Sequence, residues 1–303
     1  MTITNALLLV LTTVAVVTAE SFNNLFGKKM VKKSTDITRF TMITSVCSIL
    51  TFVVLGLFSG GLEIPTLYTL MMGGIFGLIL TGFQLALYRA LGLGSFAYTT
   101  LLSSCGMVIS ALFGVVWFHQ SINVFQVIGV VLMLIMFYFN ANPKKNESVS
   151  AKWLFFAIIV FFLNGGFGVM QTVFQAYVPD GEPQMNEFLI VAFAIYAVAS
   201  FLSVLKNEKS VSKVFSIKPA TVAIASVVGV GTAINHSVNL YLSGVMDSII
   251  FFPIANGGCL IFCTLVSAVI FKERYNAKQY AGLVLGIVAI LLLSNVMNNF
   301  INV

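Results

Sequence analysis

Two ionisable side chains lie inside long apolar stretches of the sequence, where such groups are energetically costly and are commonly retained for a function. Glu20 lies eight residues before the first basic residue, Lys28, which is about 12 Å along a helix. A carboxyl group removed from water favours its protonated form, so Glu20 can exchange a proton near neutral pH. A structural role also fits the pattern, with Glu20 reaching the membrane interface or pairing with Arg39 or a loop lysine.

The second of these side chains is His236, one of two histidines in the chain. Asn235 precedes it and Asn239 follows it three residues later, and together with Gly231 they form a polar, closely packing stripe on one helix face. A neutral imidazole can relay protons near pH 6–7. Hydrogen bonding between helices is the alternative role for this stripe.

Amide side chains at helical spacing form another stripe, in which Asn164, Gly168, Gln171 and Gln175 follow one another at intervals of 4, 3 and 4 residues. Such a row either lines one wall of a cavity or bridges neighbouring helices. Further polar candidates for a binding site are Asn24, Gln84, Tyr88, Tyr98 and Asn256. Pro253 frees a backbone carbonyl and is a candidate hinge.

The composition predicts that these residues are held by membrane-spanning helices. Of 303 residues, 59% are hydrophobic and 9% are charged, and the mean hydropathy is +1.01, which excludes a typical water-soluble globule. The four cysteines lie in apolar runs and are typical of packing residues rather than of a disulfide or metal framework.

The positions of polar residues divide the apolar sequence into spans. They predict an all-α integral membrane protein with ten transmembrane helices, at about 3–26, 38–58, 66–88, 95–118, 122–140, 153–176, 186–205, 219–242, 247–271 and 276–297.

The basic residues follow a strict alternation along these ten spans. All 16 Lys and Arg residues lie in or beside alternate loops, beginning with the loop after the first span. Because basic residues are retained on the cytoplasmic side, these loops are predicted to be cytoplasmic and both termini extracytoplasmic. The net charge of +6 is then explained by membrane topology and by contact with anionic lipids, and it does not indicate nucleic-acid binding.

The first span lacks a preceding basic segment, which favours a retained helix over a cleaved signal peptide.

The second half of the sequence repeats the first with an offset of 153 residues. Asn123, Gln126 and Gly129 correspond to Asn276, Gln279 and Gly282. The offset predicts two five-helix repeats, 1–140 and 153–303, joined by a cytoplasmic linker at 141–152. Five crossings per repeat place the second repeat upside down, and two inverted five-helix repeats are typical of secondary transporters. A larger membrane scaffold built by duplication is the alternative.

A series of motifs resembles one known family. Leu240-Tyr241, Pro253, Phe271-Lys272-Glu273-Arg274, Gly282 and Gly286 resemble, in this order, the second-half signature of the drug/metabolite transporter superfamily, EamA type. The first half resembles it more weakly, with Phe118-His119-Gln120 at the usual acidic turn. The resemblance implies a ten-helix carrier of small metabolites, commonly drawn with both termini in the cytoplasm, whereas the charges here predict the reverse.

The first span carries a second resemblance. Ala19-Glu20 with Lys28 is similar to the first helix of the small multidrug resistance proteins. This resemblance implies a glutamate that binds protons and a cationic substrate in competition.

The predicted function is secondary transport of a small metabolite or drug-like solute across the plasma (inner) membrane, either proton-coupled or facilitative. Amide and hydroxyl groups favour a neutral or zwitterionic solute. The expected partners are the solute, protons and membrane lipids, with no nucleic acid, no cofactor and no metal, in a monomer or homodimer. The chain has no P-loop, H-E-x-x-H or G-x-S-x-G motif, so an enzyme is not expected. A non-transporting membrane sensor or lipid-binding scaffold is the alternative.

Overall fold

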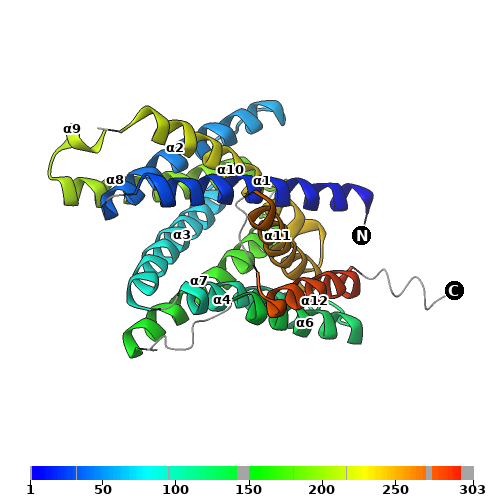
Figure 1. The fold of residues 1–303 in the computed structure, drawn as a ribbon. Helices are drawn as coiled ribbons and strands as arrows, with labels where there is room; N and C mark the ends of the chain where they lie inside the picture. The colour runs from blue at the N-terminus through cyan, green and yellow to red at the C-terminus, as the bar shows by residue number, and fades with distance from the viewer. Residues whose placement is uncertain are drawn as a thin grey trace. The chain divides into compact units, whose positions relative to one another are not determined.

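A computed structural model describes residues 2–31, 33–94, 96–141, 150–179, 181–215, 217–270 and 275–294, and all regular secondary structure within these ranges is helical. Most of the predicted linker (142–149) and the motif Phe271–Arg274 lie outside the described residues. The helices are α1 (Ile3–Lys29), α2 (Ser34–Phe58), α3 (Leu67–Leu93), α4 (Phe96–Cys105), α5 (Met107–Trp117), α6 (Val124–Ala141), α7 (Ala151–Ala176), α8 (Met185–Glu208), α9 (Val211–Val214), α10 (Pro219–Val245), α11 (Ser248–Ile270) and α12 (Ala277–Leu293) (Figure 1).

The predicted spans are found as helices. Within the described ranges, nine helical segments are long and apolar enough to cross a membrane, and α12, with 17 residues, is a shorter apolar helix. The all-α membrane fold is therefore confirmed. The short helix α9, which lies between α8 and α10, had no signal in the sequence pattern.

The predicted span 95–118 differs from its prediction, because it consists of two helices, α4 and α5, that meet at Gly106. A Cβ at Gly106 would lie 2.7 Å from the carbonyl oxygen of Phe161 and 2.9 Å from the nitrogen of Gly165, so the α7 backbone approaches closely here. The Gly106 N–H donates to the Ser103 carbonyl at 3.0 Å, three residues back. This shortened turn interrupts the regular α-helical hydrogen bonding.

The chain folds into two compact units, each of which takes residues from both halves of the sequence. Unit 1 comprises Met1–Leu9, Gly82–Ala176 and Leu242–Val303, and unit 2 comprises Val10–Thr81 and Tyr177–Tyr241. Three long helices, α1, α3 and α10, contribute to both units.

Unit 2 is built around the antiparallel pair α2 and α8. Arg39 near the start of α2 forms an ion pair of 2.8 Å with Glu208 at the end of α8. Farther along the pair, the rings of Phe52 and Phe193 meet edge to face at 5.1 Å. At the opposite end from Arg39, the Glu63 N–H after α2 donates to the Glu187 carboxylate of α8 at 2.9 Å. The α2–α8 pair is thus joined at both ends and in the middle.

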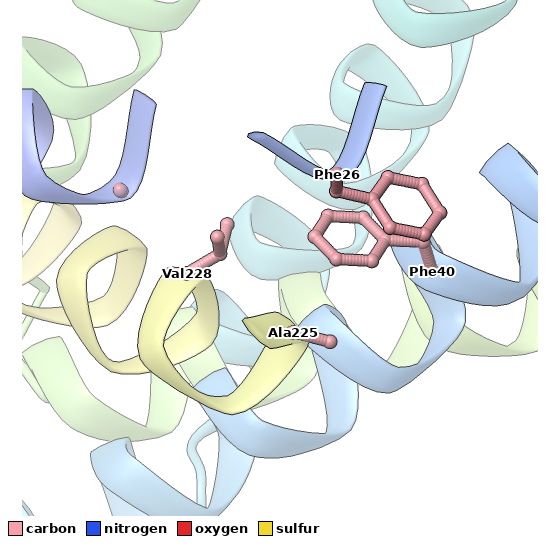
Figure 2. Packing of buried hydrophobic residues seen from close by; sticks show 5 residues of the cluster. Phe26, Phe40, Ala225 and Val228 are labelled. Atoms are coloured by element: carbon pink, nitrogen blue, oxygen red, sulfur yellow. The ribbon is translucent and has the colours of Figure 1, made fainter. Parts of the chain in front are cut away.

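Near the Arg39 end of unit 2, α1 and α10 pack against α2 through apolar side chains. Phe26 of α1 stacks on Phe40 of α2 with ring centroids 3.9 Å apart, and Ala225 and Val228 of α10 complete the buried cluster (Figure 2). Figure 2 shows the two rings lying parallel, with Ala225 and Val228 on the neighbouring helix. This cluster fixes α1 and α10 at the end of the unit where α1 terminates.

Unit 1 contains a second antiparallel pair, α6 and α12, which lie side by side (Figure 1). A Cβ at Gly129, near the start of α6, would meet Leu293 at the end of α12 at 2.8 Å. Reciprocally, a Cβ at Gly282, near the start of α12, would meet Asn140 at the end of α6 at 2.8 Å. Gly129 and Gly282, and likewise Asn140 and Leu293, are 153 residues apart, so the two contacts are equivalent under the predicted repeat.

The same two helices begin with the same cap. At the start of α6, the Gln126 N–H donates to the Asn123 side chain at 2.8 Å and the Asn123 N–H donates to the Gln126 side chain at 2.9 Å. At the start of α12, Asn276 and Gln279 exchange the same two bonds, both at 3.0 Å. Such reciprocal caps satisfy backbone donors that a helix end leaves unpaired. At the starts of these two helices, residues 153 positions apart therefore make the same cap.

Backbone contact between α3 and α8 leads to a prediction about Gly77. A Cβ at Gly77 would lie 2.6 Å from the carbonyl oxygen of Ala192, a backbone atom that cannot move aside cheaply, whereas a Cβ at Gly74 would meet only Ile195, at 3.8 Å. We expect Gly77→Ala to destabilise the purified protein by about 1–3 kcal/mol, the usual cost of overpacking. The matched variant Gly74→Ala is expected to be neutral or slightly stabilising. Thermal unfolding in detergent measures both, and equal unfolding temperatures would contradict the close contact.

Candidate functional site

A set of three hydrogen-bonded polar side chains joins α1 to α10 within unit 2, and we call it the polar node: Thr12, Asn235 and Asn239. The Thr12 hydroxyl donates to the Asn235 side-chain oxygen at 2.6 Å, and the Asn239 amide donates to the same oxygen at 3.0 Å. Thr12 is 3% exposed, whereas both asparagines are half-buried. An asparagine carries two N–H donors and one acceptor oxygen, so the node retains hydrogen-bonding capacity beyond its internal bonds.

Small residues allow α1 and α10 to approach closely beside the polar node. A Cβ at Gly231 would lie 2.8 Å from the Ala15 carbonyl oxygen and 3.1 Å from the Ala19 Cβ. Small residues at helix interfaces are typical of membrane proteins, where backbones approach closely. The predicted stripe of Gly231, Asn235 and Asn239 therefore does face a neighbouring helix, and its partner is Thr12.

His236 lies next to the polar node in sequence but faces aromatic residues. Its ring meets Phe193 of α8 at 5.2 Å and Phe76 of α3 at 6.2 Å, both edge to face. Phe52 and Phe188, both fully buried, extend this aromatic cluster. The Nδ1 atom of His236 is buried and has no hydrogen-bond partner among the described residues. A buried polar atom without a partner is unfavourable, so His236 holds an unused hydrogen-bonding atom in an apolar environment.

Glu20 lies on the side of α1 that faces away from the exposed apolar row. Around Thr13 that side is buried, but farther along the helix Glu20, Asn23 and Gly27 are exposed on it. The Glu20 carboxylate accepts a hydrogen bond from the Asn23 side chain. Asn24, another candidate, is half-buried on the same turn. The exposed apolar row on the other side of α1 consists of Val10, Leu11 and Val14.

The alternative in which Glu20 pairs with Arg39 is not what the structure shows. The Arg39 guanidinium contacts Glu208 at 2.8 Å and Asp36 at 3.6 Å. Glu20 is thus an exposed carboxyl group on the side of a predicted span opposite the exposed apolar row, with Asn23 as its hydrogen-bonding neighbour.

The polar stripe of α7 in unit 1 mostly contacts other helices. The Asn164 amide donates to the Ser103 carbonyl of α4, at the break before Gly106. A Cβ at Gly168 would meet the Phe252 ring at 2.7 Å, and Gln175 packs against Gly244. Gln171 is buried. These contacts favour a bridging role for Asn164, and the cavity-lining role of Gln171 and Gln175 stays a prediction.

The remaining candidates are distributed over three helices of unit 1. Tyr98 of α4 meets Trp153 edge to face at 6.3 Å, and the Asn256 amide of α11 donates to the Phe252 carbonyl at 2.8 Å. Pro253 is buried inside α11, which continues through it. Gln84 and Tyr88 are half-buried on α3. Within the described residues, no group of three or more His, Cys, Asp or Glu side chains is placed to hold a metal ion.

Comparison with known proteins identifies the first half of this framework. Residues 7–142, which contain most of α1 and all of α2 to α6, match the EamA-like transporter family. Over these residues the chain is similar to that family. The predicted resemblance to the EamA-type drug/metabolite transporters is thereby confirmed for this part of the chain. The match falls on the half in which the motif pattern was weaker, whereas the stronger motifs were those between Leu240 and Gly286.

The fold as a whole resembles that of a solved structure. One protein known from a crystal structure superimposes with a TM-score of 0.76, covers 99% of each chain and is 12% identical in sequence. At this identity the likeness concerns the fold alone. No curated protein sequence matches the chain significantly.

The polar node has no polar counterpart at the positions related to it by the offset of 153 residues. The residues 153 positions away from Thr12, Asn235 and Asn239 are Gly165, Gly82 and Ala86. A Cβ at Gly82 would meet Leu163 of α7 at 3.3 Å, whereas a Cβ at Gly165 would meet Ile109 and Gly106.

Thr12 was missing from the residues predicted as candidates. It lies 223 residues from Asn235, and no spacing rule connects positions so far apart. The only signal for it in the sequence is the polar pair Thr12-Thr13 within an apolar run. Phe76 and Phe193, which contact His236, carried no signal, since phenylalanine occurs 28 times in the chain.

Proposed function

We propose that this protein is a secondary carrier that moves a small neutral or zwitterionic solute across the plasma (inner) membrane. The observation that carries the proposal is the polar node, which lies inside two apolar helices of a chain whose first half is similar to the EamA-like transporters. Polar groups at membrane depth that retain hydrogen-bonding capacity are suited to binding a solute during its passage.

The proposed mechanism is alternating access between two inverted five-helix repeats. The reciprocal contacts of α6 and α12 and their identical caps support an inverted relation, because equivalent helices run antiparallel there. In transporters of this architecture, substrate sites lie near the membrane midplane between repeats, and one part moves against the other.

The proposed coupling group is Glu20, with His236 as a second proton-binding candidate. Glu20 is exposed on the side of α1 opposite its exposed apolar row, and a carboxyl group that is not covered by protein could be reached by water and a solute. His236 has an unpaired, buried Nδ1 atom next to the polar node in sequence. A carrier in which Glu20 does not exchange protons would run as a facilitator of the same solute.

The proposed orientation follows the basic residues. Lys29, Lys33, Arg39, Lys206 and Lys218 lie near the helix ends at one end of unit 2, and basic residues are retained in the cytoplasm. This end would be cytoplasmic and both termini extracytoplasmic. Cysteine labelling of the two termini in intact cells and in inverted vesicles tests the orientation.

The transport proposal is tested with purified protein in proteoliposomes. Thermal-shift screening against a panel of metabolites and cationic drugs first identifies a ligand, and uptake of that ligand is then measured with and without an imposed pH gradient. We expect protein-dependent, saturable uptake. Binding without any flux in either direction would contradict the proposal and favour the sensor or lipid-binding scaffold.

A further inference from the structure

Helix α11 presents three different faces along its second half. Gly257 packs against Met133 of α6, and Ile261 lies beside Gly286 of α12, so one face is buried within unit 1. A second face, made of Phe262, Leu265 and Val269, is apolar and exposed, with Val269 at 76%. The third face is half-buried and consists of Asn256, Cys259 and Cys263. At 3.6 residues per turn, it lies about 120° from the exposed apolar face.

The two cysteines on the third face lie close enough for both sulfurs to bind one atom. They are one helical turn apart in sequence, and their sulfur atoms are separated by 3.9 Å. Two sulfurs that each bond to a central atom at about 2.3 Å, the zinc–thiolate bond length, are about 3.8 Å apart at a tetrahedral angle. A pyramidal trivalent centre has a smaller bond angle and holds its sulfurs somewhat closer than the observed 3.9 Å, a difference that rotation of the two side chains can supply without a change of helix geometry.

We propose that Cys259 and Cys263 form a dithiol site for a trivalent, thiophilic compound of the organoarsenical class. A monosubstituted arsenic(III) oxide reacts with two thiols: two As–S bonds form, both S–H bonds are lost, and the oxygen leaves with the two protons as one water molecule. The oxidation states of arsenic and sulfur do not change, so no oxidant or reductant is needed. The product is neutral, and a neutral product suits an apolar environment better than an ion does.

The geometry favours this class over a zinc ion or a disulfide. Zinc is held by three or four protein ligands, and the pair supplies two. A disulfide requires the sulfurs to approach to about 2.05 Å and also requires an oxidant. A trivalent centre that already carries one organic group needs only two sulfurs, and the pair lies close to the separation that such a centre requires.

The site has a functional consequence that rests on the proposed transport function. Asn256, a predicted solute-binding residue, lies one turn before Cys259 on the same face of α11. An adduct on the two sulfurs would cover this face with a rigid ring. Solute flux is expected to fall at least tenfold on modification of the wild-type protein and to recover when a small dithiol removes the arsenical.

The adduct is tested without any transport measurement, by intact-protein mass spectrometry after treatment with phenylarsine oxide. We expect one tightly held phenylarsenic group, which excess 2,3-dimercaptopropanol removes and an equal excess of a monothiol does not. Cys259→Ser and Cys263→Ser should each abolish the tightly held adduct. The matched controls Cys47→Ser and Cys105→Ser remove the other two half-buried thiols and should retain it.

The outcomes separate the dithiol site from the transport proposal. A persistent adduct in Cys259→Ser or Cys263→Ser, in protein with an unchanged thermal unfolding temperature, overturns the site, as does the absence of any adduct on the wild type. An adduct that forms as expected on a protein without flux leaves the site standing and contradicts only the transport function. An adduct that leaves measurable flux unchanged removes the third face of α11 from the solute pathway.

Discussion

Replacing Glu20 by glutamine is expected to abolish solute uptake driven by a pH gradient while leaving the fold intact. Glutamine has nearly the same shape as a protonated glutamate but cannot release a proton. Glu20 is exposed on α1 and accepts a hydrogen bond from Asn23, and a glutamine oxygen can accept the same bond. Uptake of the identified solute into proteoliposomes, measured over a range of external pH, should therefore become independent of pH and of the imposed gradient.

The matched control for this experiment is Glu182→Gln. Glu182 is exposed between α7 and α8, so its substitution removes one negative charge outside the helices, and wild-type pH dependence is expected. Solute binding by the Glu20→Gln protein, measured by thermal shift at one pH, should remain within about threefold of wild type for a neutral solute. If Glu20→Gln keeps the wild-type pH dependence, the coupling role of Glu20 is excluded.

Replacing Asn239 by leucine is expected to weaken solute affinity by about tenfold to a hundredfold. The substitution removes the hydrogen bond to Asn235 at 3.0 Å and every bond that the amide would make to a solute. Hydrogen bonds contribute about 0.5–1.5 kcal/mol each, and 1.4 kcal/mol corresponds to a factor of ten in affinity. Binding isotherms of the purified variant measure the change directly.

The control variant for Asn239 is Asn207→Leu, which makes the same substitution elsewhere. The Asn207 amide is exposed at the end of α8 and donates to the Ser203 carbonyl of its own helix at 2.9 Å. Its replacement should leave affinity unchanged. Wild-type affinity in both variants would remove the polar node from the binding site, whereas a parallel loss in both would indicate a general effect of the substitution.

Most of the fold could be predicted from the sequence because a membrane imposes a length on each helix. About 20 apolar residues are needed to cross it, and polar breaks such as Ser59-Gly60-Gly61 mark the ends. The division of one span at Gly106 could not be predicted. Glycine is common in membrane helices, and other glycines such as Gly77 also meet the backbone of a neighbouring helix. The break is visible only in the hydrogen bond from Gly106 to Ser103, three residues back.

The candidate site could be predicted only in part, since spacing along one helix says which residues share a face but not what they face. The stripe containing Asn235 and Asn239 does meet another helix at Thr12. Asn164 belongs to an equally regular stripe, yet it donates to a backbone carbonyl at a helix break. Amide side chains serve both purposes, so the choice between binding and bridging depends on the neighbouring helix.

The joints along α2 and α8 have a mechanical consequence. An ion pair joins Arg39 to Glu208 at one end of the pair, and a hydrogen bond joins Glu63 to Glu187 at the other. Because both ends are joined, the two helices resist sliding past one another and should move as one rigid unit. A rotation of one end of the α2–α8 pair should therefore move the other end with it. Bending during a conformational change would then occur elsewhere in the chain, and we expect the break between α4 and α5 at Gly106 to be one such position.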